Sequence, residues 1–154
     1  MSIIERFYTA FGECDGAAMS ACYAPAAHFS DPVFPDLNGD EPGAMWRMLT
    51  SQATDLRIEL LEHTADTAHW RAFYTFSQTG RSVENDVRAR FRLDGEGLIA
   101  DHKDEFGFHR WARQALGPPG LLLGWTPLLR SKVRSNAAKS LQRFMAREAQ
   151  SSPP

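Results

Sequence analysis

The sequence predicts an α+β fold, in which a long, curved antiparallel sheet packs on N-terminal helices and leaves a cone-shaped interior. Two observations predict this fold. Helical patterns come first and a run of strand patterns follows, an order typical of α+β proteins. The last two strands form a hairpin with one apolar face. With 154 residues, the chain is long enough for one such domain with a core of its own.

The hairpin spans residues 79–108, and its side chains alternate between two faces. Period-two alternation indicates a sheet with one buried and one exposed face. The turn at residues 94–97, with sequence DGEG, supplies the backbone freedom that a hairpin needs. We expect the buried face to carry Val83, Asn85, Val87, Ala89, Phe91, Ala100, His102, Asp104 and Phe106.

Three polar side chains share that apolar face, namely Asn85, His102 and Asp104. Buried polar groups must either be paired with one another or face a cavity. The hairpin therefore predicts a pocket inside the cone as well as a core.

Two helices are predicted before the first strand. Residues 3–13 place apolar side chains at helical spacing, which indicates an amphipathic helix. Asp15 is a suitable N-cap for a second helix over residues 16–24, which Pro25 ends.

A short strand over residues 28–30 follows, and it ends at Asp31-Pro32 because a residue before proline is pushed out of the helical conformation. Asn38-Gly39 marks a turn. A third helix is expected over residues 42–52.

The remaining strand patterns cover residues 55–63 and 69–78, and with the hairpin they make four long antiparallel strands. In the second of these segments, alternate residues place one set of side chains on a single face: Trp70, Ala72, Tyr74 and Phe76.

The chain changes character after Phe108. We expect a cone domain over residues 1–108, a helical extension over 109–150 and a disordered tail over 151–154. Within the extension, a short helix over 110–116 precedes the apolar patch LLLGW at 121–125. A long helix then begins at Thr126-Pro127.

The long helix has an apolar stripe and a basic remainder. Residues 126–154 hold six basic side chains against one acid, Glu148, so the segment carries +5 and the rest of the chain −7, within a total of −2. Three arrangements are open. The stripe docks on its own domain, which we favour; it swaps onto a partner chain; or, with the LLLGW patch, it rests on an anionic membrane surface.

Composition limits the function classes. The chain has neither a basic body nor interleaved aromatic residues, so we expect no binding to nucleic acid. Its N-terminus lacks the layout of a signal peptide, and no apolar run approaches a membrane span. Cys14 and Cys22, both in predicted helix, have no zinc or redox spacing and indicate reduced thiols. A cytoplasmic protein without a metal or cofactor is expected.

The segments FYTAFGECD, FSDPVF…LNG and TGRSVENDVRARFRLDGEGLIADHKDEF resemble the nuclear transport factor 2-like superfamily. That group includes ketosteroid isomerases, limonene-epoxide hydrolases and polyketide cyclases of the SnoaL type. The resemblance covers residues 3–108 and implies the cone fold. It does not by itself choose a reaction, because this fold carries many functions.

For each of these three families, this sequence matches one catalytic residue but not the residues that act with it. The isomerases' proton-shuttling aspartate before proline matches Asp31, but their two oxyanion donors stand at positions that look like Phe7 and Ala89. The cyclases' aspartate matches Asp104, while their histidine position again looks like Ala89. The epoxide hydrolases' Asp–Arg–Asp set keeps Asp104 and finds Tyr74 and Phe76 at the other two positions.

The candidate catalytic residues are Asp104, His102 and Asp31. A carboxylate on an apolar face has its charged form disfavoured, which moves its pKa toward that of a useful base. His102 lies two residues from Asp104 on the same face, so the two side chains are expected to meet. Structural alternatives are a hydrogen-bonded carboxylate, a satisfied core histidine and an aspartate that caps a turn.

The candidate ligand pocket combines two polar side chains, Tyr74 and Asn85, with an apolar wall. The expected wall residues are Trp70, Phe76, Val87, Ala89, Phe91 and Phe106.

The sequence therefore predicts an acid–base enzyme of isomerase, cyclase or hydrolase type that acts on a small hydrophobic molecule. The alternatives are a non-catalytic binder and a dimerisation module of the same fold. A basic row, Arg88, Arg90 and Arg92, lies on the outer face of the hairpin opposite acids of the next strand. In this fold that face often forms a dimer interface, so a homodimer is expected.

Overall fold

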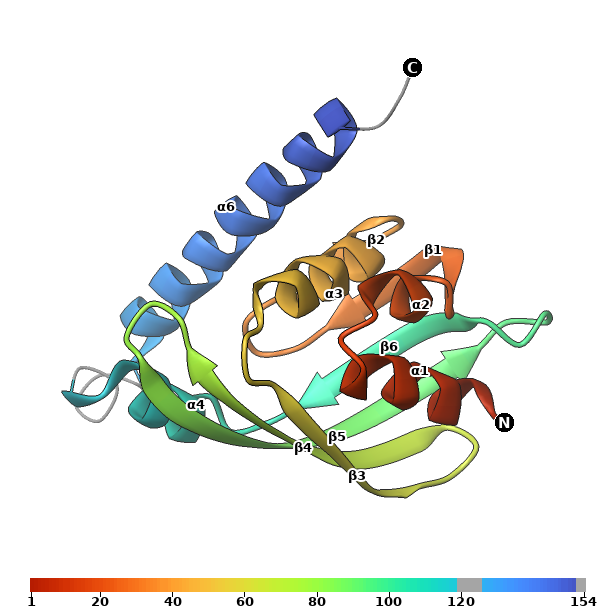
Figure 1. The fold of residues 1–154 in the computed structure, drawn as a ribbon, viewed down its shortest axis with the longest axis horizontal. Helices are drawn as coiled ribbons and strands as arrows, with labels where there is room; N and C mark the ends of the chain where they lie inside the picture. The colour runs from red at the N-terminus through yellow and green to blue at the C-terminus, as the bar shows by residue number, and fades with distance from the viewer. Residues whose placement is uncertain (119–125, 152–154) are drawn as a thin grey trace.

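The computed structural model describes residues 1–118 and 126–151, and it confirms the α+β fold. N-terminal helices lie on one side of a curved sheet that is not closed into a barrel, and a long helix follows (Figure 1). In chain order the described elements are α1 (Ile3–Gly12), α2 (Gly16–Ser20), β1 (Tyr23–Ser30), β2 (Leu37–Asn38), α3 (Glu41–Gln52), β3 (Arg57–His63), β4 (Thr67–Phe76), β5 (Arg81–Leu93), β6 (Ile99–Glu105), α4 (Phe108–Leu116) and α6 (Pro127–Ser151).

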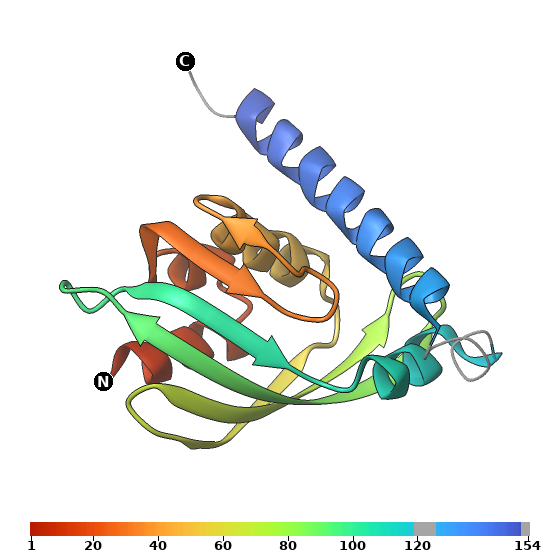
Figure 2. The same ribbon diagram turned by 180° about the vertical axis from the view of Figure 1, so that it is seen from behind.

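The six strands form one sheet in the order β2-β1-β6-β5-β4-β3. Strands β3 to β6 pair antiparallel with their chain neighbours, as expected from the sequence, while β1 pairs parallel with β6. Figure 2 shows β1 beside β6 and the long β4–β5 hairpin curving away from it. The sheet thereby brings residues near Ser30 next to the end of β6, where Asp104 lies.

The first strand is longer than the sequence indicates. The predicted helix over 16–24 ends at Ser20, and β1 begins at Tyr23 and contains Pro25. Its pairing with β6 is irregular between Tyr23 and His28, so proline's missing N–H falls where no regular ladder exists. Cys22 consequently lies outside a helix, and Cys14 lies between α1 and α2; both are free thiols.

One side chain of the hairpin, Ala100, does not face inward as predicted. The register shifts between Arg92 and Leu93, so that Leu93 pairs with Ile99. Ile99 is fully buried, whereas Ala100, predicted for the inner face, is only half-buried. A bulge of this kind inserts one residue and changes which side chains face inward. Beyond it, His102 and Asp104 both face inward as predicted.

Helix α1 begins with a capping box. The Ser2 hydroxyl accepts from the Glu5 backbone N–H, and the Glu5 carboxylate accepts from the Ser2 backbone N–H. These two bonds satisfy N–H groups that the first turn of a helix leaves without partners. The cap orients a helix whose inward face carries Ile4, Phe7, Tyr8, Ala10 and Phe11.

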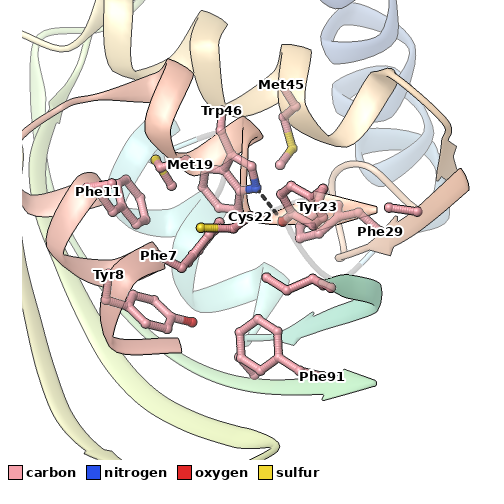
Figure 3. Packing of buried hydrophobic residues seen from close by; sticks show 14 of the residues in the cluster. Phe7, Tyr8, Phe11, Met19, Cys22, Tyr23, Phe29, Met45, Trp46 and Phe91 are labelled. Carbon is pink, nitrogen blue, oxygen red and sulfur yellow. Dashed lines mark hydrogen bonds between the residues drawn. The ribbon is translucent and has the colours of Figure 1, made fainter. Parts of the chain in front are cut away.

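Phe7 of α1 lies at the centre of the core (Figure 3). Its ring makes edge contacts with Tyr23, Trp46 and His102 at centroid distances of 5.8, 5.6 and 5.5 Å. Edge-to-face packing of this kind contributes beyond the buried area. The core therefore joins α1, β1, α3 and β6 through aromatic side chains.

Helix α6 docks on the same domain, which is the arrangement favoured from the sequence. Leu141 is only 1% exposed and belongs to the main core cluster. Arg47 of α3 donates from Nε and Nη2 to the two carboxylate oxygens of Glu148, at 2.8 and 2.9 Å. Arg134 donates from Nε to the backbone oxygen of Pro32 at 2.9 Å. One apolar and two polar contacts thus fix α6 against α3 and the loop after β1.

Some sequence predictions are not tested by the described structure. The apolar patch at 121–125 and residues 152–154 of the predicted tail lie outside the described residues, while Ser151 is the last residue of α6. Within the described chain, no helix is long and apolar enough to cross a membrane. The row Arg88, Arg90 and Arg92 is exposed on the outer face, and homodimerisation through that face stays a prediction.

Replacing Leu141 with alanine tests the docking of α6. We expect Leu141→Ala to lower the free energy of unfolding by about 3 kcal/mol, because it removes a buried side chain from the core. It should also speed hydrogen exchange of the α6 amides. Leu128→Ala is the matched control, since Leu128 is on the same helix and 81% exposed. Equal urea midpoints for the two variants would show that α6 does not pack as described.

Candidate functional site

A cavity of about 660 Å³ lies between the sheet, α3 and α6. Cavities of this size accept small organic molecules. Of the residues predicted for the site, those in its wall are Asp31, Trp70, Tyr74, Phe76, Asn85, Val87, Asp104 and Phe106. His102, Ala89 and Phe91 lie behind the wall, buried in the core.

Asp31 combines a structural role with an unusual acidity. Its Oδ1 accepts from the backbone N–H groups of Val33 and Phe34 at 2.7 and 2.5 Å, which is the turn-capping arrangement that the sequence left open. Burial raises the pKa of this carboxyl to about 7, and the negative charge of Asp104 adds to the rise. The two N–H bonds and Arg134 act in the opposite direction. A carboxyl with this pKa accepts and releases protons near neutral pH.

Asp104 is the second carboxylate of the cavity. It is 3% exposed and lies on β6 opposite Ala89 of β5. Its Oδ1 is 2.8 Å from Nε2 of His102, so the two predicted residues do meet. The contact satisfies a buried acid, while the presence of Asp104 in the cavity wall keeps that acid near a bound molecule.

His102 belongs to a hydrogen-bonded chain of four side chains. Trp46 Nε1 donates to the Tyr23 hydroxyl at 2.8 Å, and that hydroxyl is 2.6 Å from His102 Nδ1. Indole N–H only donates, so the Tyr23 oxygen accepts from Trp46. An ionised Asp104 only accepts, so Nε2 of His102 donates to it, and Nδ1 of the neutral imidazole then accepts from the Tyr23 O–H. His102 is enclosed, and it acts on the cavity only through Asp104.

The sequence does not indicate the first two members of this chain. It places Tyr23 in a helix, and it places Trp46 in the helix over 42–52 without a polar role. Figure 3 shows the Trp46 nitrogen directed at Tyr23 in the core between α3 and β1. The available signal was general: buried Tyr and Trp side chains need a partner for their polar atom.

Tyr74 carries a hydroxyl in the cavity wall. It accepts a hydrogen bond of 2.8 Å from Nε1 of Trp111, a residue of α4 that also lines the cavity and was not predicted. Burial raises the pKa of Tyr74, so the hydroxyl keeps its proton. Within the described chain no acceptor takes that proton, which leaves the O–H as a donor for a bound molecule.

Two further polar atoms are buried without a hydrogen-bond partner in the described part of the chain. They are the hydroxyl of Tyr8 and the indole Nε1 of Trp70, whose rings lie 5.7 Å apart. Other atoms of Trp70 line the cavity, but its Nε1 is enclosed in the core. Such orphan polar groups are rare in protein interiors because burying them without a partner is costly.

The extension supplies a whole wall that was not predicted as part of the site. Six residues of α6 line the cavity: Leu129, Lys132, Val133, Asn136, Ala137 and Ser140. The sequence showed this helix as amphipathic, but periodicity alone does not say what a helix covers. Among the described residues, no three His, Cys, Asp or Glu side chains gather as a metal-binding set.

Removing the Tyr23 hydroxyl tests the hydrogen-bonded chain. We expect Tyr23→Phe to lower the free energy of unfolding by about 2 kcal/mol, because it leaves Trp46 Nε1 and His102 Nδ1 buried without partners. Tyr8→Phe is the control: it removes a buried hydroxyl that has no partner among the described residues. If urea unfolding shows the two variants to be equally stable, the chain does not stabilise the core.

The comparisons with known proteins agree with this architecture. A search of curated proteins finds no match. A comparison with protein families matches residues 4–102 to the SnoaL-like domain, a member of the nuclear transport factor 2-like superfamily. The matched segment includes Asp31 and His102 and ends before Asp104 and the helices α4 and α6. Because the match covers most of the chain, this protein belongs to the SnoaL-like domain family.

Proposed function

We propose that the protein binds a small, largely apolar organic molecule in this cavity and transfers a proton on it through Asp31. One observation carries the proposal: a carboxyl whose pKa is raised to about 7 lies in the wall of a cavity of small-molecule size. General acid–base catalysis is most efficient when the pKa of the catalytic group lies near the working pH.

The neighbouring groups have different tasks in this proposal. Asp104 raises the pKa of Asp31 by its charge and is held by His102. Tyr74 offers an O–H donor for an oxygen that gains negative charge. This donor stands at a different position from the isomerase pair, whose positions look like Phe7 and Ala89, both buried in the core.

The reaction class follows from those groups. A base with a pKa near neutral, together with a hydrogen-bond donor in the same cavity wall, suits abstraction of a proton beside a carbonyl, as in isomerisation or cyclisation. Activation of a water molecule for hydration requires the same base. We favour carbonyl chemistry because Tyr74 supplies a donor and the cavity wall is otherwise mostly apolar.

A specific observation favours a second function, non-catalytic binding. Oδ1 of Asp31 already accepts from two backbone N–H groups, so the carboxylate has a structural task that does not need a substrate. In that case the cavity holds its ligand and Asp31 only shapes the loop. The two functions differ in whether a proton on the ligand exchanges.

Deuterium exchange separates them. Apolar ketones such as cyclohexanone, 1-indanone and 2-tetralone are incubated with the protein in D2O, and deuterium incorporation is followed by NMR. We expect the exchange rate to rise with pH and level off above about 7, because Asp31 acts as a base only when ionised. Asp31→Asn keeps an acceptor oxygen for the turn but removes the base, so the rate should fall on the order of 100-fold.

The control is Glu105→Gln, which removes an exposed acid on the outer face next to Asp104 in sequence. It should leave the exchange rate unchanged. Equal rates for the wild type and Asp31→Asn would rule out Asp31 as the base. No exchange of any ketone above the buffer rate would leave the binding function and overturn the carbonyl chemistry.

A further inference from the structure

The wall that α6 contributes to the cavity has two parallel stripes. Residues four apart lie on one side of a helix, so Leu129, Val133 and Ala137 form an apolar stripe. A polar stripe, formed by Lys132, Asn136 and Ser140, runs beside it and also lines the cavity. This wall lies outside the segment that matches the SnoaL-like domain, so it is a feature of this chain's own extension.

The polar stripe is held in position. Leu141, one residue beyond the stripe, is buried in the core, and the Arg47–Glu148 pair ties the end of the helix to α3. Arg134 anchors the middle of α6 to Pro32. With these contacts on other sides of the helix, the stripe keeps its orientation toward the cavity.

The three polar side chains of the stripe have no hydrogen bond or ion pair within the part of the chain that the structure describes. One of the acids in the cavity wall, Asp55, already accepts from the backbone N–H and hydroxyl of Thr75, at 3.0 and 2.6 Å. The lysine ammonium has three donors, the Asn136 amide has two and the Ser140 hydroxyl has one. Their combined preference is for an acceptor with negative charge.

The two sides of the cavity therefore differ. The sheet side combines apolar residues such as Trp70 and Val87 with the acids Asp31 and Asp104. The α6 side presents the cation Lys132 with two uncharged donors, next to the β4–β5 turn (Figure 1). An anionic group is repelled by Asp31 and Asp104 and attracted by Lys132, so it would lie at the α6 side. The third acid of the wall, Asp55, is exposed, so water screens its charge, and it is engaged by Thr75.

We infer that the cavity takes an amphipathic ligand, with an apolar body against the sheet and an anionic head group on Lys132, Asn136 and Ser140. The inference rests on the proposed binding function and adds the chemical class of the ligand. Lys132 acts here as a specificity-determining residue. It lies at the exposed edge of the cavity, which suits a charged head group that stays partly in water.

Two fluorescent dyes that differ only in charge test the inference. 8-Anilino-1-naphthalenesulfonate and N-phenyl-1-naphthylamine share the same aromatic body, and only the first carries a sulfonate. The sulfonate keeps its charge throughout the working pH range, so its binding reports on Lys132 without titration of the dye. Both dyes are titrated into the full chain, with dye fluorescence as the readout.

We expect the anionic dye to bind more tightly than the neutral one, and Lys132→Gln to weaken only the anionic dye, about threefold to fivefold, as suits a partly exposed charge pair. The preference should shrink at high salt. Lys139→Gln is the matched control, because Lys139 is an exposed lysine of the same helix outside the cavity wall. Val133→Trp, which fills the cavity from α6, should weaken both dyes.

The outcomes distinguish the anionic head group from ligand binding in the cavity. Equal affinity for both dyes, or equal effects of Lys132→Gln and Lys139→Gln, overturns the anionic head group and leaves the proposed cavity binding intact. If neither dye binds, or if Val133→Trp binds both dyes as the wild type does, binding in this cavity fails and the inference fails with it.

Discussion

The buried contact between His102 and Asp104 is the constraint on which the rest of the site depends. A carboxylate that is 3% exposed requires a partner, and the imidazole 2.8 Å away supplies it. The imidazole in turn requires the Tyr23 hydroxyl, which also accepts from Trp46. Three elements, β6, β1 and α3, are thereby held in one relative arrangement by polar bonds inside an aromatic core, where a mispaired group would be costly.

That arrangement determines the character of the cavity. Because β1 lies parallel to β6, the loop after β1 places Asp31 near Asp104, and the charge of Asp104 adds to burial in raising the pKa of Asp31. The same loop is held from the other side by Arg134 of α6. The core fixes the position of Asp104, the charge of Asp104 raises the pKa of Asp31, and α6 completes the cavity wall. The catalytic and binding proposals thus depend on residues from both parts of the chain.

The sequence predicted the fold class, the long strands and the inward direction of His102 and Asp104, because period-two patterns depend only on local geometry. It did not predict the parallel pairing of β1, the bulge at Ile99 or the hydrogen bonds of Tyr23, since each depends on a partner far along the chain. It also missed Trp111 and the α6 residues of the cavity wall. An apolar stripe predicts that one face of a helix is buried, but it does not identify the element that buries it. Polar residues at the edge of a cavity have the same sequence pattern as other solvent-exposed residues.

The most direct test of this account is a pH titration of the Asp31 carboxyl carbon by 13C NMR, assigned by comparison with Asp31→Asn. We expect a midpoint of about 7, and a lower midpoint in Asp104→Asn, where the neighbouring negative charge is absent. A midpoint near the ordinary aspartate value of 3.8 would contradict it, because the cavity would then hold no group able to exchange protons near neutral pH in the role proposed for Asp31.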